Sequence, residues 1–314
     1  MKTYLKSNNS AKLFFVKLLI FLLLGWGIDR ACGMILSRIS HNTGGNYRDY
    51  IINTAEGDCF VLGASTANHH YDPSVLADSL KMKVYNAGWD GEGIFHYYTL
   101  LNAICERIHP NLVILDLSPD ALFYDAKYYD RLSYFNFWYD QDTTFRSVVH
   151  LKSKYEIFKM YSHLYRYNSN IDKVLFAFIT GKQQDHDRFP YGYKPLACLK
   201  SPIVFDDYRP TNTSIDPFLV EYLERIIKKC KEENINLVVT MSPQYYLNRG
   251  EKSESHSLLL QICKEHHVPV IDNSRSAYFL DHSAYFIDNV HLCQEGAEVY
   301  TKLFLKELRD YKIQ

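Results

Sequence analysis

The sequence predicts an α/β protein built on a parallel β-sheet that helices cover on both faces. Three observations lead to this prediction. Short runs of consecutive apolar residues alternate along the chain with longer segments whose apolar residues recur at helical spacing. The apolar runs lack the apolar–polar alternation of a half-exposed strand, so both faces of the sheet should be buried. The chain of 314 residues is long enough to bury a sizeable core, in one large domain or two small ones.

The N-terminal residues predict a membrane anchor. Four lysines and no acidic residue lie before or within an apolar stretch of about 16 residues that ends at Ile28. Lys17 can extend toward the headgroups, and Trp26 stands where an interfacial aromatic belongs. The lysine excess predicts a cytoplasmic N-terminus. We therefore expect residues 1–40 to form a cytoplasmic N-terminus and a single transmembrane helix, with the main domain, residues 41–314, on the periplasmic or cell-surface side.

A cleaved signal peptide is the alternative for this segment. The apolar run is followed by Ile-Asp-Arg-Ala-Cys at residues 28–32, which is too charged for a normal cleavage site or a lipid-attachment box. We therefore favour an uncleaved anchor. Under either interpretation the bulk of the chain is exported.

The exported part begins with three predicted strands. After a connector through about residue 55, strands are expected at 59–62, 83–86 and 112–117. Helices are expected at 73–81, which Pro73 opens, and at 94–108, where seven apolar residues share one face.

The C-terminal third repeats this alternation. Asp216 and Pro217 begin a helix, and a strand at 235–240, a helix at 255–267, a strand at 268–271 and a last helix at 293–310 follow. The region from about 120 to 215 breaks the rhythm with a helical stretch near 152–178 and a loop rich in glycine and proline. We interpret it as a lid-like insertion in the same domain.

Composition and cysteine spacing exclude several classes of protein. With 23% charged and 47% apolar residues, the chain is no disordered tail, collagen-like repeat or polytopic membrane protein. The net charge of −1 gives no basic field for a nucleic-acid partner. The cysteines are odd in number and far apart in sequence. This pattern predicts that they are small buried apolar residues and do not form a disulfide framework or a metal site. We expect no metal and no cofactor. The cysteines are Cys32, Cys59, Cys105, Cys198, Cys230, Cys263 and Cys293.

Three loops carry residue types suited to nucleophilic chemistry, and two of them directly follow predicted strands, where parallel sheets bind ligands. Ser65 follows the first strand in Gly63-Ala64-Ser65 and opens a helix, so its hydroxyl should project beyond the sheet. The second loop, residues 86–93, holds three glycines whose N–H groups can approach a substrate closely. Asp288 lies three residues before His291 and can orient that imidazole toward a serine.

These blocks, in this order, resemble the SGNH/GDSL hydrolase superfamily over about residues 58–125 and 235–310. The resemblance implies a flavodoxin-like three-layer α/β/α sandwich and no cofactor. It implies that Ser65 is the nucleophile, His291 the general base and Asp288 its orienting carboxylate. It also implies that the N–H groups of Ser65 and Gly91 form an oxyanion hole. The anchor and exported domain resemble envelope members that transfer or remove acyl groups.

One family block departs from the pattern. Residues 117–120 read Leu-Ser-Pro-Asp where the family has Gly-x-Asn-Asp, so Pro119 replaces an asparagine that donates to the oxyanion. Ser118, Asn86 or a group from the insertion could substitute for it. His69 and His70 either line the pocket or are exposed polar residues.

The combined expectation is a membrane-anchored serine esterase that acts on acyl esters, such as acetyl esters, of cell-envelope glycans. Two alternatives remain open at this stage. One is an O-acyltransferase for an envelope polysaccharide that works with a membrane acyl-donor protein. The other is a catalytically silent relative that binds glycan.

Overall fold

The computed structural model of this protein describes residues 2–42, 47–168, 171–180, 189, 191–200, 212–245 and 252–311. The chain divides into two compact units. The first, which we call the helical unit, comprises Met1–Asn46 and Ser133–Gln183. The second, the sheet unit, comprises Tyr47–Leu132 and Gln184–Gln314.

The sheet unit is built on five parallel strands, as predicted. The strands are β1 (Cys59–Gly63), β2 (Val84–Asn86), β3 (Leu112–Asp116), β4 (Asn236–Met241) and β5 (Val270–Asp272). Their order is β2-β1-β3-β4-β5, the flavodoxin-like order in which the sheet grows from β1 in both directions. β1 pairs with β3 from Cys59 opposite Leu112 to Gly63 opposite Asp116. The loops after β1 and β3 therefore flank the point where a ligand site is expected.

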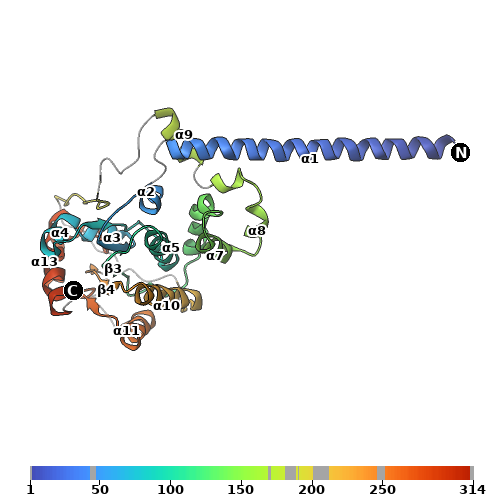
Figure 1. Ribbon diagram of the computed structural model, residues 1–314. Coiled ribbons are helices and arrows are strands. Elements are labelled where there is room, and N and C mark those ends of the chain that lie inside the picture. Colours follow the sequence, from blue (N-terminus) through green and yellow to red (C-terminus); the bar gives the residue numbers. More distant parts are fainter. Residues whose placement is uncertain are drawn as a thin grey trace. The chain divides into compact units, whose positions relative to one another are not determined.

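Helices cover both faces of this sheet (Figure 1). Their described members are α2 (Tyr47–Asn53), α3 (Ser65–His70), α4 (Pro73–Leu80), α5 (Ile94–Cys105), α6 (Ala126–Asp130), α10 (Pro217–Glu232), α11 (Glu254–Glu265), α12 (Ala277–Leu280) and α13 (Gln294–Leu308), with the short 3-10 helices η4 (Ser283–Tyr285) and η5 (Arg309–Tyr311). α3, α4 and α13 pack together over one face, and α5 packs with α2 and α10 over the other. Because the chain moves from β1 to β2 in one direction and then back to β3 in the other, right-handed crossovers place the helices on opposite faces. The predicted α/β fold class is confirmed.

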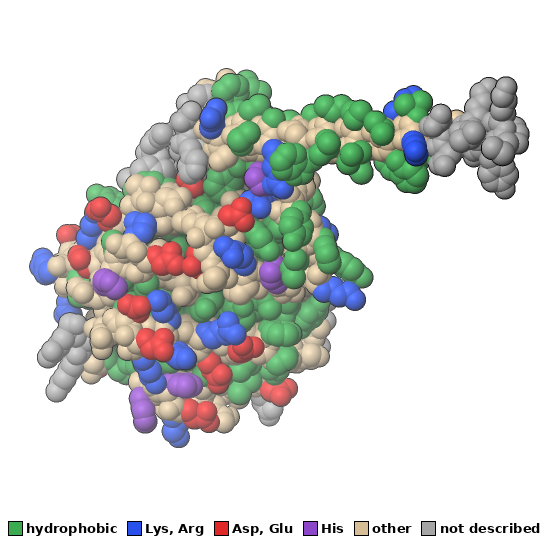
Figure 2. Space-filling view, turned by 45° about the vertical axis from the view of Figure 1, so that its right-hand side comes forward, with side chains coloured by type: hydrophobic (Ala, Val, Ile, Leu, Met, Phe, Trp, Pro, Cys, Tyr) green, Lys and Arg blue, Asp and Glu red, His purple; other side chains and the backbone are tan. Residues whose placement is uncertain are grey.

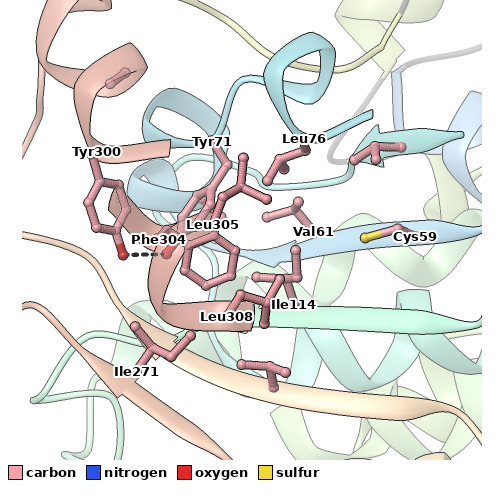
Figure 3. Packing of buried hydrophobic residues seen from close by; sticks show 14 of the residues in the cluster. Cys59, Val61, Tyr71, Leu76, Ile114, Ile271, Tyr300, Phe304, Leu305 and Leu308 are labelled. Atoms are coloured by element: carbon pink, nitrogen blue, oxygen red, sulfur yellow. Dashed lines mark hydrogen bonds between the residues drawn. The ribbon is translucent and has the colours of Figure 1, made fainter. Parts of the chain in front are cut away.

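The part of the core between the sheet and α13 shows why the strands are uniformly apolar. Val61, Ile114 and Ile271 lie against Tyr71 and Phe304 (Figure 3). All five residues of β1 and all five of β3 are buried. Adjacent side chains in a strand point to opposite faces, so a sheet covered on both sides requires a continuous buried run.

The helical unit contains α1 (Lys2–Asn42), α7 (Thr143–Lys152), α8 (Glu156–Lys159), η2 (Tyr165–Tyr167) and α9 (Ile171–Thr180), and η1 (Arg131–Trp138) begins at the boundary of the two units. α1 is one continuous helix. Its segment Ser10–Ser40 is long and apolar enough to cross a membrane. Figure 2 shows this part of α1 as a band of apolar side chains.

Most predicted elements of the sheet unit agree with the observed ones to within three residues, but two expectations were wrong. The connector through about residue 55 is largely helical, because α1 continues to Asn42 and α2 buries Ile51 and Ile52. The helix expected near 152–178 is several short elements. Ser153 is extended and ends α7, so the apolar spacing beyond it belongs to separate helices.

The cysteine prediction is also wrong in part. Cys198 and Cys293 form a disulfide across a sequence separation of 95 residues. A pair so far apart leaves no local spacing signal, since only the tertiary fold brings the two thiols together. Four other cysteines are buried, as predicted, and Cys32 is half-buried. Within the glycine- and proline-rich loop predicted before residue 215, Gly181, Pro190, Pro202 and Pro210 lie outside the described residues.

Candidate active site

Ser65 is the first residue of α3 and stands directly beyond the end of β1. The turn is tight because Gly63 lacks a side chain: an added Cβ would lie 2.6 Å from the carbonyl oxygen of Asp116 and 2.6 Å from Ala67 Cβ. Ala64 is the N-cap of α3 and no side chain caps the helix. The Ser65 side chain therefore does not cap α3, and its hydroxyl is directed elsewhere.

The Ser65 hydroxyl is hydrogen-bonded to His291, which lies on the loop before α13. Ser65 Oγ is 2.7 Å from His291 Nε2, and His291 Nδ1 is 2.7 Å from Asp288 Oδ2. The carboxylate can only accept, so Nδ1–H donates to Asp288 and Nε2 is left to accept from the hydroxyl. Residues more than 220 positions apart in sequence thus form one hydrogen-bonded chain.

Asp288 also fixes the backbone of this loop. Its Oδ1 accepts from the N–H groups of Val290 and His291, each at 2.7 Å. Partial burial raises the pKa of Asp288, but the hydrogen bonds from the His291 ring and from the two N–H groups outweigh it and lower the pKa to about 2. Asp288 is therefore a carboxylate at neutral pH.

The glycine loop after β2 packs closely on α3. A Cβ at Gly88 would overlap the backbone of Asn68, so only glycine fits there. Asn86 is fully buried: its amide donates to the carbonyls of Ala67 (2.7 Å) and Tyr71 (3.0 Å), and its Oδ1 accepts from Gly88 N–H (3.0 Å). Asn86 therefore holds α3 in place and does not line an open pocket.

Gly91, the predicted second oxyanion donor, is exposed and has a φ of 73° that favours glycine. A Cβ at this position would overlap the guanidinium of Arg131, which donates to the carbonyl of Asp90 at 3.1 Å. Arg131 comes from the predicted insertion, where no local sequence pattern marks it as a site residue. It brings a positive charge to the glycine loop.

The loop after β3 has no side-chain donor at position 119. Ser118 is half-buried, and its Oγ accepts from the N–H of Asp120 at 3.3 Å, which closes a turn. Pro119 is buried, and its carbonyl accepts from the Ser255 hydroxyl at 2.8 Å.

His69 and His70 are buried, which excludes the alternative that they are exposed polar residues. His69 Nδ1 is 2.6 Å from the carbonyl of Lys194, and its Nε2 is 3.1 Å from Asp90 Oδ1. Both partners are acceptors, so each ring nitrogen of His69 faces an atom to which it can donate. The rings of His69 and His291 meet edge to face, with centroids 5.7 Å apart.

His70 lies behind His291 and is uncharged. Its Nε2 accepts from the N–H of Leu292 at 2.9 Å, and its Nδ1–H donates to Ser242 Oγ at 3.0 Å. Burial, followed by the positive charge that His291 and His69 carry when protonated, lowers the pKa of His70 well below its usual value. With both nitrogens in use, His70 holds the residue next to His291 and does not line the pocket.

Asp116 closes this buried network at the end of β3. Its Oδ1 accepts from Tyr71 OH (2.9 Å) and Ser242 N–H (3.1 Å), and Oδ2 accepts from Thr66 and from the Ser242 hydroxyl. Complete burial raises the pKa of Asp116 to about 6, although these hydrogen bonds oppose the shift. Tyr71 in turn contacts Tyr300 OH at 3.1 Å (Figure 3). The sequence did carry a signal for Asp116, because an acidic residue at the end of an otherwise apolar strand is unusual.

Residues 191–200, which we call the strap, join three parts of the site. The Asn86 N–H donates to the carbonyl of Tyr191 at 2.9 Å, and the Lys194 N–H donates to the carbonyl of Asn68 at 3.1 Å. The disulfide then ties Cys198 to Cys293, two residues beyond His291. The strap therefore links the glycine loop, α3 and the His291 loop.

Comparison with known proteins shows limited similarity. No protein-family profile matches the chain, and no curated protein matches it. Among solved structures, an acetyl xylan esterase is similar with a TM-score of 0.39 and 12% identity, over 79% of this chain and 98% of that one. A gut microbial diltiazem-metabolizing enzyme gives a TM-score of 0.40 and 13% identity, over 80% of this chain and 46% of that one. These similarities are too low to bear on the chemistry of this chain.

Proposed function

We propose that this protein is a serine-dependent enzyme of the SGNH type that hydrolyses acyl esters. The observation that carries the proposal is the hydrogen-bonded chain in which His291 lies 2.7 Å from Ser65 Oγ and 2.7 Å from Asp288 Oδ2. A hydroxyl in contact with an imidazole that a carboxylate orients is the arrangement that activates a serine nucleophile.

In the proposed reaction, Ser65 Oγ attacks the ester carbonyl while His291 Nε2 takes its proton. Asp288 stabilises the imidazolium that forms. The tetrahedral intermediate collapses, the proton passes from His291 to the leaving alkoxide, and an alcohol departs. Water then attacks the acyl-serine with His291 as its base, and the acid leaves as the Ser65 hydroxyl is restored.

The oxyanion of the intermediate would be held by the N–H groups of Ser65 and Gly91. Pro119 cannot supply the side-chain donor that the family has in this block. We assign that role to Arg131, because its guanidinium reaches the Gly91 loop and donors with a positive charge stabilise a developing oxyanion strongly.

We propose that α1 anchors the enzyme as a single-pass membrane protein with its main domain outside the cytoplasm. Two observations support this. Lysines precede the apolar part of α1, as in helices whose N-terminus is cytoplasmic. The Cys198–Cys293 disulfide is of a kind that persists in oxidising compartments such as the periplasm or cell surface. The substrate we propose is an acylated envelope glycan, which rests on the sequence resemblance.

The second candidate function is O-acyl transfer, in which a sugar hydroxyl replaces water at the acyl-serine and a membrane protein supplies the acyl group. The long apolar α1 favours it, because it would keep the enzyme beside such a partner. A third, a catalytically silent glycan-binding protein, is favoured by Pro119.

The test uses the purified full chain in detergent with a short-chain aryl acetate and a fluorophosphonate probe. Wild type and a Ser257→Ala control, which alters an exposed serine on α11, should hydrolyse the ester and be labelled. Ser65→Ala should do neither. A Ser65→Ala variant with wild-type turnover would overturn the nucleophile assignment. Slow labelling with hydrolysis absent until an acyl donor and acceptor are added indicates the transferase. Glycan binding without labelling indicates the silent protein.

A further inference from the structure

The helical unit exposes a cluster of large apolar side chains on and after α8. Tyr155, Ile157, Phe158, Tyr161 and Leu164 are between 40% and 70% exposed. We call these five residues the α8 surface. Single exposed apolar residues are common on protein surfaces. Five of them within the ten residues 155–164 indicate an interaction surface.

The α8 surface is fixed to α1 at a defined level. Asp29 accepts hydrogen bonds from the Ser162 hydroxyl and from the N–H groups of His163 (2.8 Å) and Leu164 (3.1 Å). Arg30 donates to the carbonyl of Tyr161 at 2.9 Å. One turn of α1 thus holds both ends of the segment 161–164.

The approach of this segment to α1 is close. A Cβ at Gly33 would overlap His163, so the glycine permits the contact. Farther along α1, Leu36 packs with Tyr167 and Val174 in a small buried cluster. The contact between α1 and the α8 surface is therefore part of the folded unit.

With α1 anchored as proposed above, this contact lies next to the end of the apolar run, where the membrane–water boundary is expected. Asp29 and Arg30 are the first charged residues after the apolar run that ends at Ile28. Their charged groups are satisfied by the 161–164 segment, which lowers the cost of placing them at the edge of a bilayer. Tyr161, whose carbonyl Arg30 binds, is of a residue type enriched in the aromatic belt of membrane proteins.

We propose that the α8 surface lies in the headgroup layer of the same membrane that α1 crosses. The proposal rests on the membrane anchoring proposed above and is independent of the esterase chemistry. Lipid is the occupant that the contacts favour, because the surface is continuous with the lipid-exposed helix and basic residues border it. The exposed ones are Lys154 and Lys159, of which Lys159 also pairs with Glu156 at 2.8 Å.

A second membrane contact has a mechanical consequence. A single helix leaves the attached unit free to turn about the helix axis. An additional apolar contact at the boundary would restrict that rotation and hold the helical unit in one orientation on the membrane.

The experiment places an environment-sensitive fluorophore on single cysteines in the full chain, reconstituted in phosphatidylcholine–phosphatidylglycerol vesicles. The background is Cys32→Ser, in which the remaining free cysteines are buried and the disulfide is kept. The probed positions are Phe158→Cys, Leu19→Cys in α1 and Phe218→Cys. Phe218 is an apolar residue of the sheet unit that is 47% exposed, and it serves as the matched control.

The label at position 158 should shift to the blue and lose intensity when the vesicles carry a nitroxide near the lipid headgroup, while the label at 218 should not. If position 19 is quenched by a nitroxide on the lipid acyl chain and position 158 is not quenched by the headgroup nitroxide, the surface proposal is wrong and the anchor stands. If position 19 is not quenched by the acyl-chain nitroxide, the anchor itself fails.

Two further outcomes also overturn the proposal. A blue-shifted label at position 158 that lipid nitroxides do not quench would show that protein, either a second copy or a partner, covers the α8 surface. Equal quenching at positions 158 and 218 would show unspecific adhesion to vesicles. In a Phe158→Glu variant, a label on Tyr155→Cys should lose its quenching while the Leu19 label keeps it.

Discussion

Behind the contact between Ser65 and His291 lies a buried layer of polar residues, in which His70 and Asp116 occupy the central positions. His70 connects the loop of His291 to Ser242, and Ser242 connects to Asp116 at the end of β3. Such networks stabilise one geometry when every member is satisfied, and they are sensitive to the loss of one partner.

Replacing His70 should disturb His291 through Leu292. In His70→Asn the amide can reach Ser242 but not Leu292, so a buried N–H loses its acceptor at a cost of about 1–3 kcal/mol. We expect a lower kcat for aryl acetate with little change in KM, and partial recovery in the longer His70→Gln. The control, His267→Asn, changes an exposed histidine whose φ of 56° asparagine tolerates, and it should behave as wild type. An unchanged kcat in His70→Asn would show that the contact is dispensable.

Asp116 should make the stability of the protein depend on pH between about 4 and 6. Its folded pKa is raised from 3.8 to about 6, so the buried acid favours its protonated form. The stability that it contributes is complete below the unfolded pKa and is lost as pH rises through the folded pKa, by at most roughly 3 kcal/mol. The free energy of unfolding should therefore fall less steeply with rising pH in Asp116→Asn than in wild type. Asp78→Asn, at an exposed position, should keep the wild-type slope.

Arg131 should matter to the reaction rate more than to substrate binding. If its guanidinium replaces the missing donor at position 119, Arg131→Gln should lower kcat by about 10²–10³-fold, as for loss of one oxyanion donor. Arg225→Gln removes a half-exposed arginine that pairs with Glu221 on α10 and should leave kcat unchanged. An equal effect of the two substitutions would exclude a local role for Arg131.

The sequence located some of these residues and not others, for a physical reason. Ser65, Asp288 and His291 occur in loops with a recognisable order of residue types. Asp116 and Arg131 acquire their surroundings only through tertiary contacts, as does the buried position of His70. The burial of a polar side chain depends on the helices that fold over it, and neither periodicity nor spacing reports that.

At the scale of elements, the strands were predictable because each is an uninterrupted apolar run between turn residues. The short helices were not, since fewer than two turns give too little periodicity. Such elements depend on tertiary contacts, as α2 does on α5 and the 161–164 turn does on α1. The strap is a similar case: it has no regular structure, yet its hydrogen bonds and its disulfide connect the loops of the site.

The disulfide of the strap should contribute substantially to stability. Removal of a native disulfide costs about 2–5 kcal/mol, and the loop that it closes here spans 95 residues. The double variant Cys198→Ser/Cys293→Ser should therefore have a lower Tm and lower esterase activity. Reductant should lower the Tm of wild type and of the Cys32→Ser control but not that of the double variant. A Tm in wild type that does not respond to full reduction would contradict this role.

At the scale of the whole molecule, the chain combines a flavodoxin-like sheet unit with a helical unit that carries α1. The order β2-β1-β3-β4-β5 brings the loops after β1 and β3 to one edge, where Ser65 and Asp116 lie. The lysines before the apolar part of α1 then predict the side of the membrane on which this edge operates.

This orientation can be checked on intact cells with a membrane-impermeant maleimide and single-cysteine variants of the Cys32→Ser chain. A cysteine at Phe218 should react, whereas one at Ser10 should react only after the cells are opened. The reverse pattern would place the main domain in the cytoplasm and remove the support for an envelope substrate.

Asp288 serves two groups with one short side chain. One oxygen fixes the peptide N–H groups of its own loop and the other fixes the imidazole ring. A glutamate, one methylene longer, cannot keep both contacts in the same loop, since restoring either would displace the other. A negative charge at position 288 is therefore not enough. A glutamate there would also require a loop of different length to keep both sets of hydrogen bonds.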